Sequence, residues 1–385
     1  MNEQIIQAQT AVTSPDIAYP AKSRNYSIVS PFIDFLLVGG VSVFIIPFVM
    51  LPFWESAEHS LWLGFTAYFL IFVLNLPHFI HSYQLLYRGY FTKMGSSAYG
   101  RGTKIRMAIS GVIAPAVLIV FLLFGASQPD SRMLGYGTNV MLFTLGWHYV
   151  KQGYGIMMAL SVRKKVFFDK MEKHILLANA YIVWLYSWFS LNTNANTEVY
   201  YGVPFTGAGL PVSWREPVLI LFLLWTVIAV TILIRKSDRH PVLCYNGLAA
   251  YFFAVYPWVL FAFAHPNIII FIPALHSLQY ILFVWKLVYE RTKEELLRAG
   301  HTVQKVTRKL VFKKMLAFLV IGFGAGALLF IAFPLWLDQI VPYNKEIFDP
   351  SLFVYCFLIF LNIHHYFIDF ALWRRDNPEM KYLHR

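Results

Sequence analysis

Ten long apolar segments are the feature that most restricts how this chain can fold. A helix needs about 20 apolar residues to cross the hydrocarbon core of a bilayer, and each segment is close to or above that length. The segments cover residues 31–53, 60–87, 104–126, 132–161, 174–191, 216–234, 241–263, 265–287, 315–337 and 350–373. The sequence therefore predicts an all-α, polytopic bundle of about ten transmembrane helices.

The composition agrees with a membrane protein. Of the 385 residues, 58% are hydrophobic and only 14% are charged, whereas soluble domains have roughly 25% charged residues. The net charge of +12 is interpreted as loop charge that faces an anionic membrane surface, and no nucleic-acid-binding module is recognisable. The expected partners are the lipid bilayer and apolar small molecules, and nucleic acid is excluded.

The charges of the loops predict the orientation. Lysine and arginine are concentrated in every second loop, and cytoplasmic loops carry such an excess. Both termini are therefore expected in the cytoplasm, with the ten-span domain over 31–373 in a bacterial inner membrane. The polar N-terminal tail over 1–30 lacks the pattern of a cleavable signal, and a second tail covers 374–385.

Two loops have a distinct composition. Residues 192–215 contain several glycines and prolines and are expected to form an external loop. Residues 290–314 carry eight Lys or Arg against three Glu, which predicts a basic helix on the cytoplasmic surface. Cys244 and Cys356 lie far apart in apolar segments, so no disulfide framework is expected.

Six histidines inside the predicted spans carry the main functional signal. Ionisable side chains are costly in hydrocarbon, so they indicate a functional site at this depth. They are His78 and His81 in the second span, His148 in the fourth, His276 in the eighth, and His364 and His365 in the tenth. Counted back from the first cytoplasmic charge, most of them lie about 10–15 Å from the inner interface. The sequence predicts that these six are metal ligands in one layer.

The adjacent pair His364 and His365 leaves one question open. Their side chains differ in direction by about 100° around the helix axis. Both imidazoles can bind one metal only if the site lies between them. Otherwise one of the two binds the metal and the other packs against neighbouring helices.

Polar residues near the histidines are expected to complete the site. A metal-bound imidazole needs its second nitrogen held by a carboxylate, carbonyl or amide. The expected supporting residues are Gln84, Gln152, Gln279 and Asn362. Lys151 needs a counter-ion at its depth, and Asp369 is the expected one. The candidate catalytic residues are Tyr280, as a proton donor, together with Lys151 and Asp369.

Two further patterns concern the helices that carry the histidines. Pro77 and Pro273 precede histidines, and each is expected to kink its helix and free a carbonyl. In addition, the segment His81–Gln84 is similar to His276–Gln279, and His148-Tyr149 is similar to His365-Tyr366. These matches predict a parallel internal repeat of spans one to four and seven to ten; chance similarity is the alternative.

The histidine motifs resemble those of the histidine-rich integral-membrane non-haem iron oxygenases, the desaturases and hydroxylases. His78-x-x-His81 and His364-His365 are similar to parts of their HxxxH and HxxHH boxes, although the full HxxHH spacing is absent. The resemblance implies iron on the cytoplasmic side of the membrane. Multispan carotene-cleaving dioxygenases, which hold iron with four histidines, are similar in architecture.

Imidazole ligands without cysteine suit iron, copper or zinc, and a metal inside the membrane is reached most easily from the bilayer. The expected function is therefore an intramembrane, histidine-ligated oxidoreductase with one or two iron ions. It would act with dioxygen on a lipid-like substrate and take electrons from an external donor protein. One alternative is a b-type haem held by His148 and His276. The other is a proton- or ion-coupled transporter that uses the buried His, Lys151 and Asp369.

Overall fold

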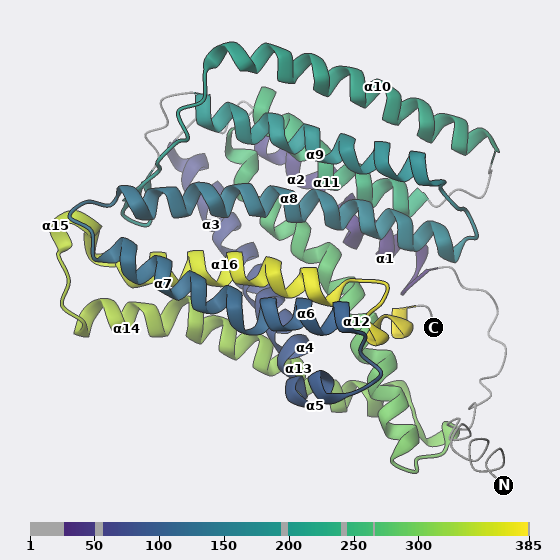
Figure 1. Ribbon diagram of the computed structural model, residues 1–385. Helices are drawn as coiled ribbons and strands as arrows, with labels where there is room; N and C mark the ends of the chain where they lie inside the picture. The colour runs from purple at the N-terminus through teal and green to yellow at the C-terminus, as the bar shows by residue number, and fades with distance from the viewer. Residues whose placement is uncertain (1–26, 51–56, 194–198, 240–244, 265, 384–385) are drawn as a thin grey trace, which may run out of the picture.

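The protein is all-α, as predicted (Figure 1). The computed structural model describes residues 27–50, 57–193, 199–239, 245–264 and 266–383. Strands occur in this part only as a short antiparallel hairpin of β1 (Val199–Tyr200) and β2 (Val203–Pro204). The hairpin lies in the segment predicted as an external loop. Cys244 is outside the described residues, and Cys356 is a free thiol.

The α-helices run from α1 to α16. In chain order they are α1 (Pro31–Phe35), α2 (Ser42–Met50), α3 (Ala57–Leu70), α4 (Leu76–Tyr87), α5 (Tyr90–Gly95), α6 (Arg101–Ala108), α7 (Ala114–Ala126), α8 (Arg132–Arg163), α9 (Lys170–Thr193), α10 (Arg215–Arg239), α11 (Tyr245–Phe263), α12 (Ile272–Arg298), α13 (Arg308–Ala327), α14 (Phe333–Ile340), α15 (Lys345–Phe348) and α16 (Leu352–Leu372).

Shorter helical turns join or interrupt these helices. The π-helical turns are η1 (Leu36–Gly40), η3 (Ile71–Asn75), η4 (Ile109–Ile113) and η8 (Leu328–Ala332). The 3₁₀ turns are η5 (Val212–Trp214), η6 (Pro266–Ile270), η7 (Val303–Lys305), η9 (Asp349–Ser351) and η10 (Pro378–Leu383).

Nine helical stretches of the described residues are long and apolar enough to cross a membrane. They are Pro31–Phe48, Leu61–Tyr87, Arg101–Ala126, Lys170–Thr193, Val212–Arg239, Tyr245–Phe263, Ile268–Arg298, Arg308–Ile340 and Lys345–Leu372. The protein is therefore an integral, multi-pass membrane protein in its architecture. The remaining predicted span, 132–161, corresponds to α8, whose 32 residues are long enough to cross. It is less apolar because it contains glycines, His148, Lys151 and Gln152.

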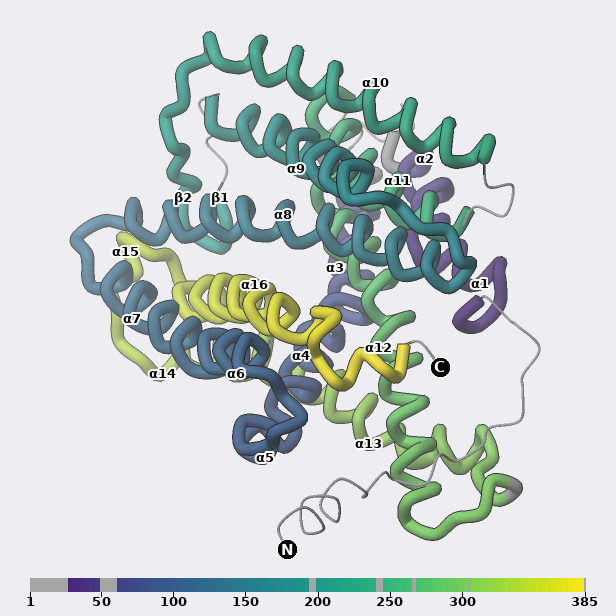
Figure 2. The backbone as a smooth tube through the Cα atoms, turned by 45° about the vertical axis from the view of Figure 1, so that its right-hand side comes forward, coloured from purple at the N-terminus to yellow at the C-terminus, as the bar shows by residue number. Residues whose placement is uncertain are grey.

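The helices pack in successive layers from α10 inward (Figure 2). Helix α10 lies outermost and packs on α9, α9 packs on α8, and α8 packs on both α11 and α16. Only Phe222 and Ala229 of α10 are buried, so most of its apolar side chains face outward, as suits contact with lipid. Helix α4 contacts α16 and α12. The four histidine-bearing helices therefore lie in the interior.

Three of the π-helical turns are followed by proline. Pro77, Pro115 and Pro334 each occupy the second residue of the α-helix after the turn. Proline has no N–H, so the ordinary i→i−4 hydrogen bond is lost, and a π turn is a known way to absorb such a break. The predicted distortion at Pro77 is therefore present. The prediction for Pro273 is wrong, because Pro273 lies in the first turn of α12, after η6, where proline fits without a kink.

The predicted surface helix over 290–314 is not a separate helix. Its first third continues α12 to Arg298, and η7 and the start of α13 make up the rest. Charged side chains of this region, such as Arg291, can be buried because they pair with residues of the C-terminal segment. Glu379 lies 3.2 Å from Lys93 and 3.7 Å from Arg291. The predicted tail over 374–385 therefore packs on α12, through η10, in its described part.

Candidate metal centre

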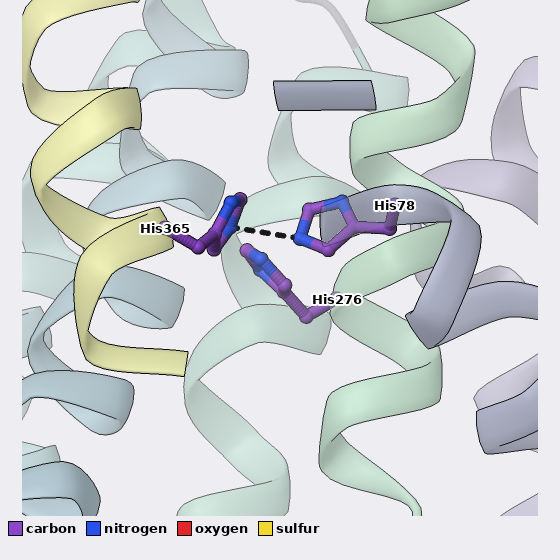
Figure 3. A group of neighbouring side chains, drawn as sticks. All are labelled: His78, His276 and His365. Atoms are coloured by element: carbon purple, nitrogen blue, oxygen red, sulfur yellow. Dashed lines mark hydrogen bonds between the residues drawn. The ribbon is translucent and has the colours of Figure 1, made fainter. Parts of the chain in front are cut away.

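Four imidazoles and one carboxylate meet in the interior. They are His78 from α4, His148 from α8, His276 from α12, and His365 and Asp369 from α16, all of them buried. Two overlapping groups have potential ligand atoms within 4.8 Å of one another: His78, His276 and His365, and also His148, His365 and Asp369. Figure 3 shows the first group, with its three side chains pointing toward one another from three helices.

The contacts inside the centre are short. The Nε2 atoms of His78 and His365 are 2.9 Å apart. Asp369 Oδ2 lies 3.5 Å from the Nε2 atoms of both His148 and His365. The ring centroid of His276 is 5.0 Å from that of His78 and 4.8 Å from that of His148. His365 therefore contacts both halves of the centre.

Ser82 determines which nitrogen of His365 faces the centre. The Ser82 hydroxyl donates to the carbonyl oxygen of Phe79 at 2.6 Å, so its oxygen must accept the hydrogen bond of 2.8 Å from His365 Nδ1. The proton of a neutral His365 is then on Nδ1. Its Nε2 presents a lone pair to the centre, which is the form that binds a metal.

Several polar atoms of the centre have no hydrogen-bond partner among the described residues. They are His78 Nδ1, His148 Nε2, both ring nitrogens of His276, and Asp369 Oδ2. A buried polar atom that is left unsatisfied costs about 1–3 kcal/mol, and native proteins contain few of them. Their concentration at one point indicates a group that binds there.

Aromatic rings fix the direction of the imidazoles. The Tyr149 ring stacks on His276 at 3.8 Å between centroids, and the Tyr366 ring stacks on His148 at 4.8 Å. Tyr280 packs edge-on against His78 at 4.0 Å, and its hydroxyl donates to Asp369 Oδ1 at 3.2 Å. Oδ1 is thus held by Tyr280, and Oδ2 remains available at the centre.

A small cavity adjoins His276. It has a volume of about 10 Å³ and is bounded by residues of α8, α11 and α12, including Tyr149 and Gln279. This volume holds about one water molecule. The centre therefore has room beside His276 for a molecule of that size in the arrangement seen here.

Two of the six predicted ligands, His81 and His364, do not reach the centre. His364 Nε2 donates to the carbonyl oxygen of Ser110 at 2.7 Å, so its Nδ1 accepts from the Tyr83 hydroxyl at 2.7 Å. Both of its nitrogens are used, so His364 is the packing member of the adjacent pair. His81 Nδ1 is held by Gln84 Oε1 at 2.9 Å, and its ring stacks on Phe318.

The backbone near each of these outer histidines explains its place. Pro115 cannot donate to Ser110 in the i→i−5 pattern of η4, which leaves the Ser110 carbonyl free for His364. Beside His81, a Cβ atom on Gly322 would lie 2.8 Å from Nδ1 of the ring. The absence of a side chain at Gly322 therefore makes room for this imidazole against α13.

The expected ion pair between Lys151 and Asp369 is wrong. Lys151 Nζ lies over the Trp147 ring, 4.3 Å from its centroid, and 5.1 Å from that of Phe370. Trp147 and Lys151 are four residues apart and therefore share a face of α8. His148, three residues before Lys151 on α8, contacts Asp369 instead, at 3.5 Å between Nε2 and Oδ2.

The expected amide supports are mostly placed elsewhere. Gln152 donates to the backbone carbonyl of His276 at 3.1 Å, and Gln279 donates to the carbonyl of Val38 at 2.6 Å. Asn362 accepts from the Tyr366 hydroxyl at 3.3 Å. These amides position helices and a tyrosine but not the imidazole nitrogens of the centre. Among the four, only Gln84 holds an imidazole, that of the outer His81.

Ser82 and Tyr83 were missed by reasoning from the sequence. Both lie within two residues of the predicted ligand His81 on α4, and both hold a histidine of α16, eight spans further along the chain. Serine and tyrosine are common in membrane helices, so neither residue stands out by type. The helix period would have offered one signal, because Ser82 is four residues after His78 and shares its face.

The predicted internal repeat stays a prediction. It pairs His81 with His276, of which only His276 belongs to the converging groups, and His148 with His365, which both belong to them. Comparisons with protein-family models, with curated proteins and with solved structures found no match to the chain. The chemistry must therefore be argued from the centre itself.

Proposed function

We propose that this protein is a membrane metalloprotein that holds a transition-metal ion at His78, His148, His276, His365 and Asp369. The observation that carries the proposal is His276, a fully buried imidazole with both nitrogens unpartnered among the described residues. Three more imidazoles and a carboxylate oxygen face the same point. An ion would satisfy the lone pairs that the protein leaves open.

The centre suits one ion better than two. His365 belongs to both candidate groups of ligands, but its Nδ1 is bonded to Ser82, and its Nε2 has a single lone pair. One imidazole nitrogen binds one metal, so both positions cannot be filled at once. The Nε2 atoms of His78 and His365 are joined by a hydrogen bond of 2.9 Å, and an ion bound between them would replace this bond.

Iron is the proposed metal, and an oxidoreductase that uses dioxygen is the proposed activity. The ligands are nitrogen and oxygen, and the group of His148, His365 and Asp369 has the two-histidine, one-carboxylate composition of non-haem iron oxygenases. The ion would supply the redox chemistry. Asp369 and Tyr280 would hold a proton near it, through their hydrogen bond. Electrons would come from an external donor protein.

The substrate is proposed to be apolar and to enter from the bilayer, because the centre lies among apolar transmembrane helices. The alternating charge of the loops supports a bacterial inner membrane with cytoplasmic termini. A lipid-sized molecule is far larger than the cavity beside His276. Its binding would therefore require the helices around the centre to separate.

The two alternative functions have less support. Two axial imidazoles of a haem stand about 2 Å from the iron on opposite faces of the macrocycle. The rings of His148 and His276 are too close for this, at 4.8 Å between centroids. The transporter hypothesis relied on a relay through Lys151 and Asp369, and these residues do not form an ion pair.

Elemental analysis of purified protein, with an absorbance spectrum, tests the proposal. We expect about one iron per chain, no haem absorbance band, and loss of iron in His276→Gln. His301→Gln is the matched control, because His301 is exposed between α12 and α13. Absence of any tightly bound metal would overturn the proposal. Two ions per chain would refute the single site, and zinc in place of iron would refute the redox activity.

A further inference from the structure

Two cations lie together near the centre without a carboxylate partner in the described residues. Lys151 Nζ is 5.1 Å and the Arg374 guanidinium carbon is 4.4 Å from the centroid of the same ring, that of Phe370. Arg374 makes one long hydrogen bond of 3.4 Å, from Nε to the Phe370 carbonyl. Both side chains are half-buried.

This arrangement is unfavourable unless an anion joins it. A lysine inside a membrane helix is costly and is usually paired, and two neighbouring cations also repel each other. The faces of Trp147 and Phe370 offset only part of this cost through cation–π contacts. Acidic residues are scarce here: Asp369, the nearest carboxylate in sequence to Phe370, points into the centre.

We propose that Lys151 and Arg374 bind the anionic headgroup of an amphiphile that enters from the bilayer. The ligand would be a carboxylate or phosphate on an acyl chain, because two cations require an anionic group and the surrounding rings favour an apolar chain. Arg374 follows the end of α16, so it reaches the depth at which lipid headgroups lie. Lys151, which lies deeper on α8, would bind the same anionic headgroup from the interior side.

The position of this pair also suggests the class of substrate, an inference that rests on the proposed function. Lys151 follows His148 by three residues on α8, which is a rise of about 4.5 Å. Phe370 follows Asp369 directly on α16. An anion held by Lys151 would thus lie beside the metal centre, on the two helices that supply His148 and Asp369. The substrate would then be an acidic lipid, oriented by its headgroup.

Equilibrium binding to delipidated protein in detergent tests this proposal. The probes are palmitate and dioleoylphosphatidylglycerol, with hexadecanol and dioleoylphosphatidylcholine as their counterparts without net charge. We expect the anionic probes to bind more tightly, and Lys151→Gln and Arg374→Gln each to weaken their binding about tenfold, the size of one charged hydrogen bond. Lys164→Gln, at the end of the same helix, should leave binding unchanged, and Lys151→Arg should retain it.

The outcomes are distinguishable when metal content and melting temperature are measured on the same samples. Tighter palmitate binding indicates a free acid, whereas tighter phosphatidylglycerol binding indicates a membrane phospholipid. Equal binding of charged and uncharged probes, or unchanged binding in folded variants, overturns the proposal. Charge-dependent binding to a protein without metal would refute the metal centre and retain the headgroup site.

Discussion

The two faces of α16 carry adjacent histidines with opposite roles. On one face, His365 and Asp369 join His78, His148 and His276, and five polar atoms of this group lack partners among the described residues. On the other face, which α16 turns toward α6 and η4, Ser110 of η4 and Tyr83 of α4 hold the two nitrogens of His364. Depth in the membrane and residue type are the same. The difference lies in whether the surrounding protein completes the hydrogen bonds.

The comparison shows how a ligand is distinguished from a packing residue inside a membrane. At the α6 face, polar groups bond to one another: Ser110 Oγ donates to the Phe367 carbonyl at 2.5 Å, and Arg106 binds Asp376. At the centre, one hydrogen bond joins His78 to His365, and five other polar atoms have no partner among the described residues. Polar groups whose hydrogen bonds are all made within the protein stabilise the fold, whereas polar groups left without a partner are available to a ligand.

The largest effect is expected from His365→Ala. The substitution removes the one imidazole shared by both ligand groups, so affinity for the metal should fall more than about 100-fold. Competition with a chelator measures this loss. His364→Ala serves as the control and should retain the metal, and equal loss in both variants would abolish the distinction between the two faces.

Ser82→Ala should have the next largest effect on the metal. Without the hydroxyl, His365 is no longer held with its Nε2 lone pair inward, and such supporting residues are worth about 10–100-fold in metal affinity. The control is Ser110→Ala, which removes another buried serine on the α6 face. If Ser110→Ala lowered the metal affinity as much as Ser82→Ala, the assigned tautomer of His365 would be wrong.

His364→Ala should lower stability without changing metal content. It leaves the Ser110 carbonyl and the Tyr83 hydroxyl without their partner, at about 1–3 kcal/mol for each buried group that stays unsatisfied. A lower melting temperature with unchanged iron is expected, and His364→Gln should restore part of it by offering an amide. An unchanged melting temperature would contradict the structural role.

The smallest effect concerns the pH dependence of stability, through the ion pair of Arg106 and Asp376. A hydrogen bond from the Arg106 guanidinium holds the pKa of the Asp376 carboxyl below its usual range. Because the folded-state pKa is lowered, the stabilisation is present above the unfolded pKa of about 3.9 and is lost as pH falls through the folded value. Asp376 is 56% exposed, so the effect should be below about 1 kcal/mol.

Melting temperatures of the wild type and Asp376→Asn, measured from pH 7 to pH 3, check this prediction. The difference between them should be greatest at neutral pH and should shrink toward pH 3. A difference that grows on acidification would have the wrong sign. The metal content should not depend on Asp376 at neutral pH.

The sequence predicted the helices and the four helices whose histidines meet, because hydropathy and helix rise are properties of single segments. It did not predict which face of each helix points toward the centre. The places of His81 and His364 depend on Gly322 and on the π turn before Pro115, and both act through a partner helix. Lys151 was misassigned for the same reason: its face of α8 is set by packing, and the need for a counter-ion names no particular anion.

The position of α16 along the chain has a consequence for biosynthesis. Helices α4, α8 and α12 leave the ribosome first, and they bring His78, His148 and His276 into the membrane without the residue that links them. His365 and Asp369 arrive together, on a helix made later than the other three. Loading of the proposed metal would therefore follow insertion of α16, and a nascent chain that stops before it would lack two of the five proposed ligands.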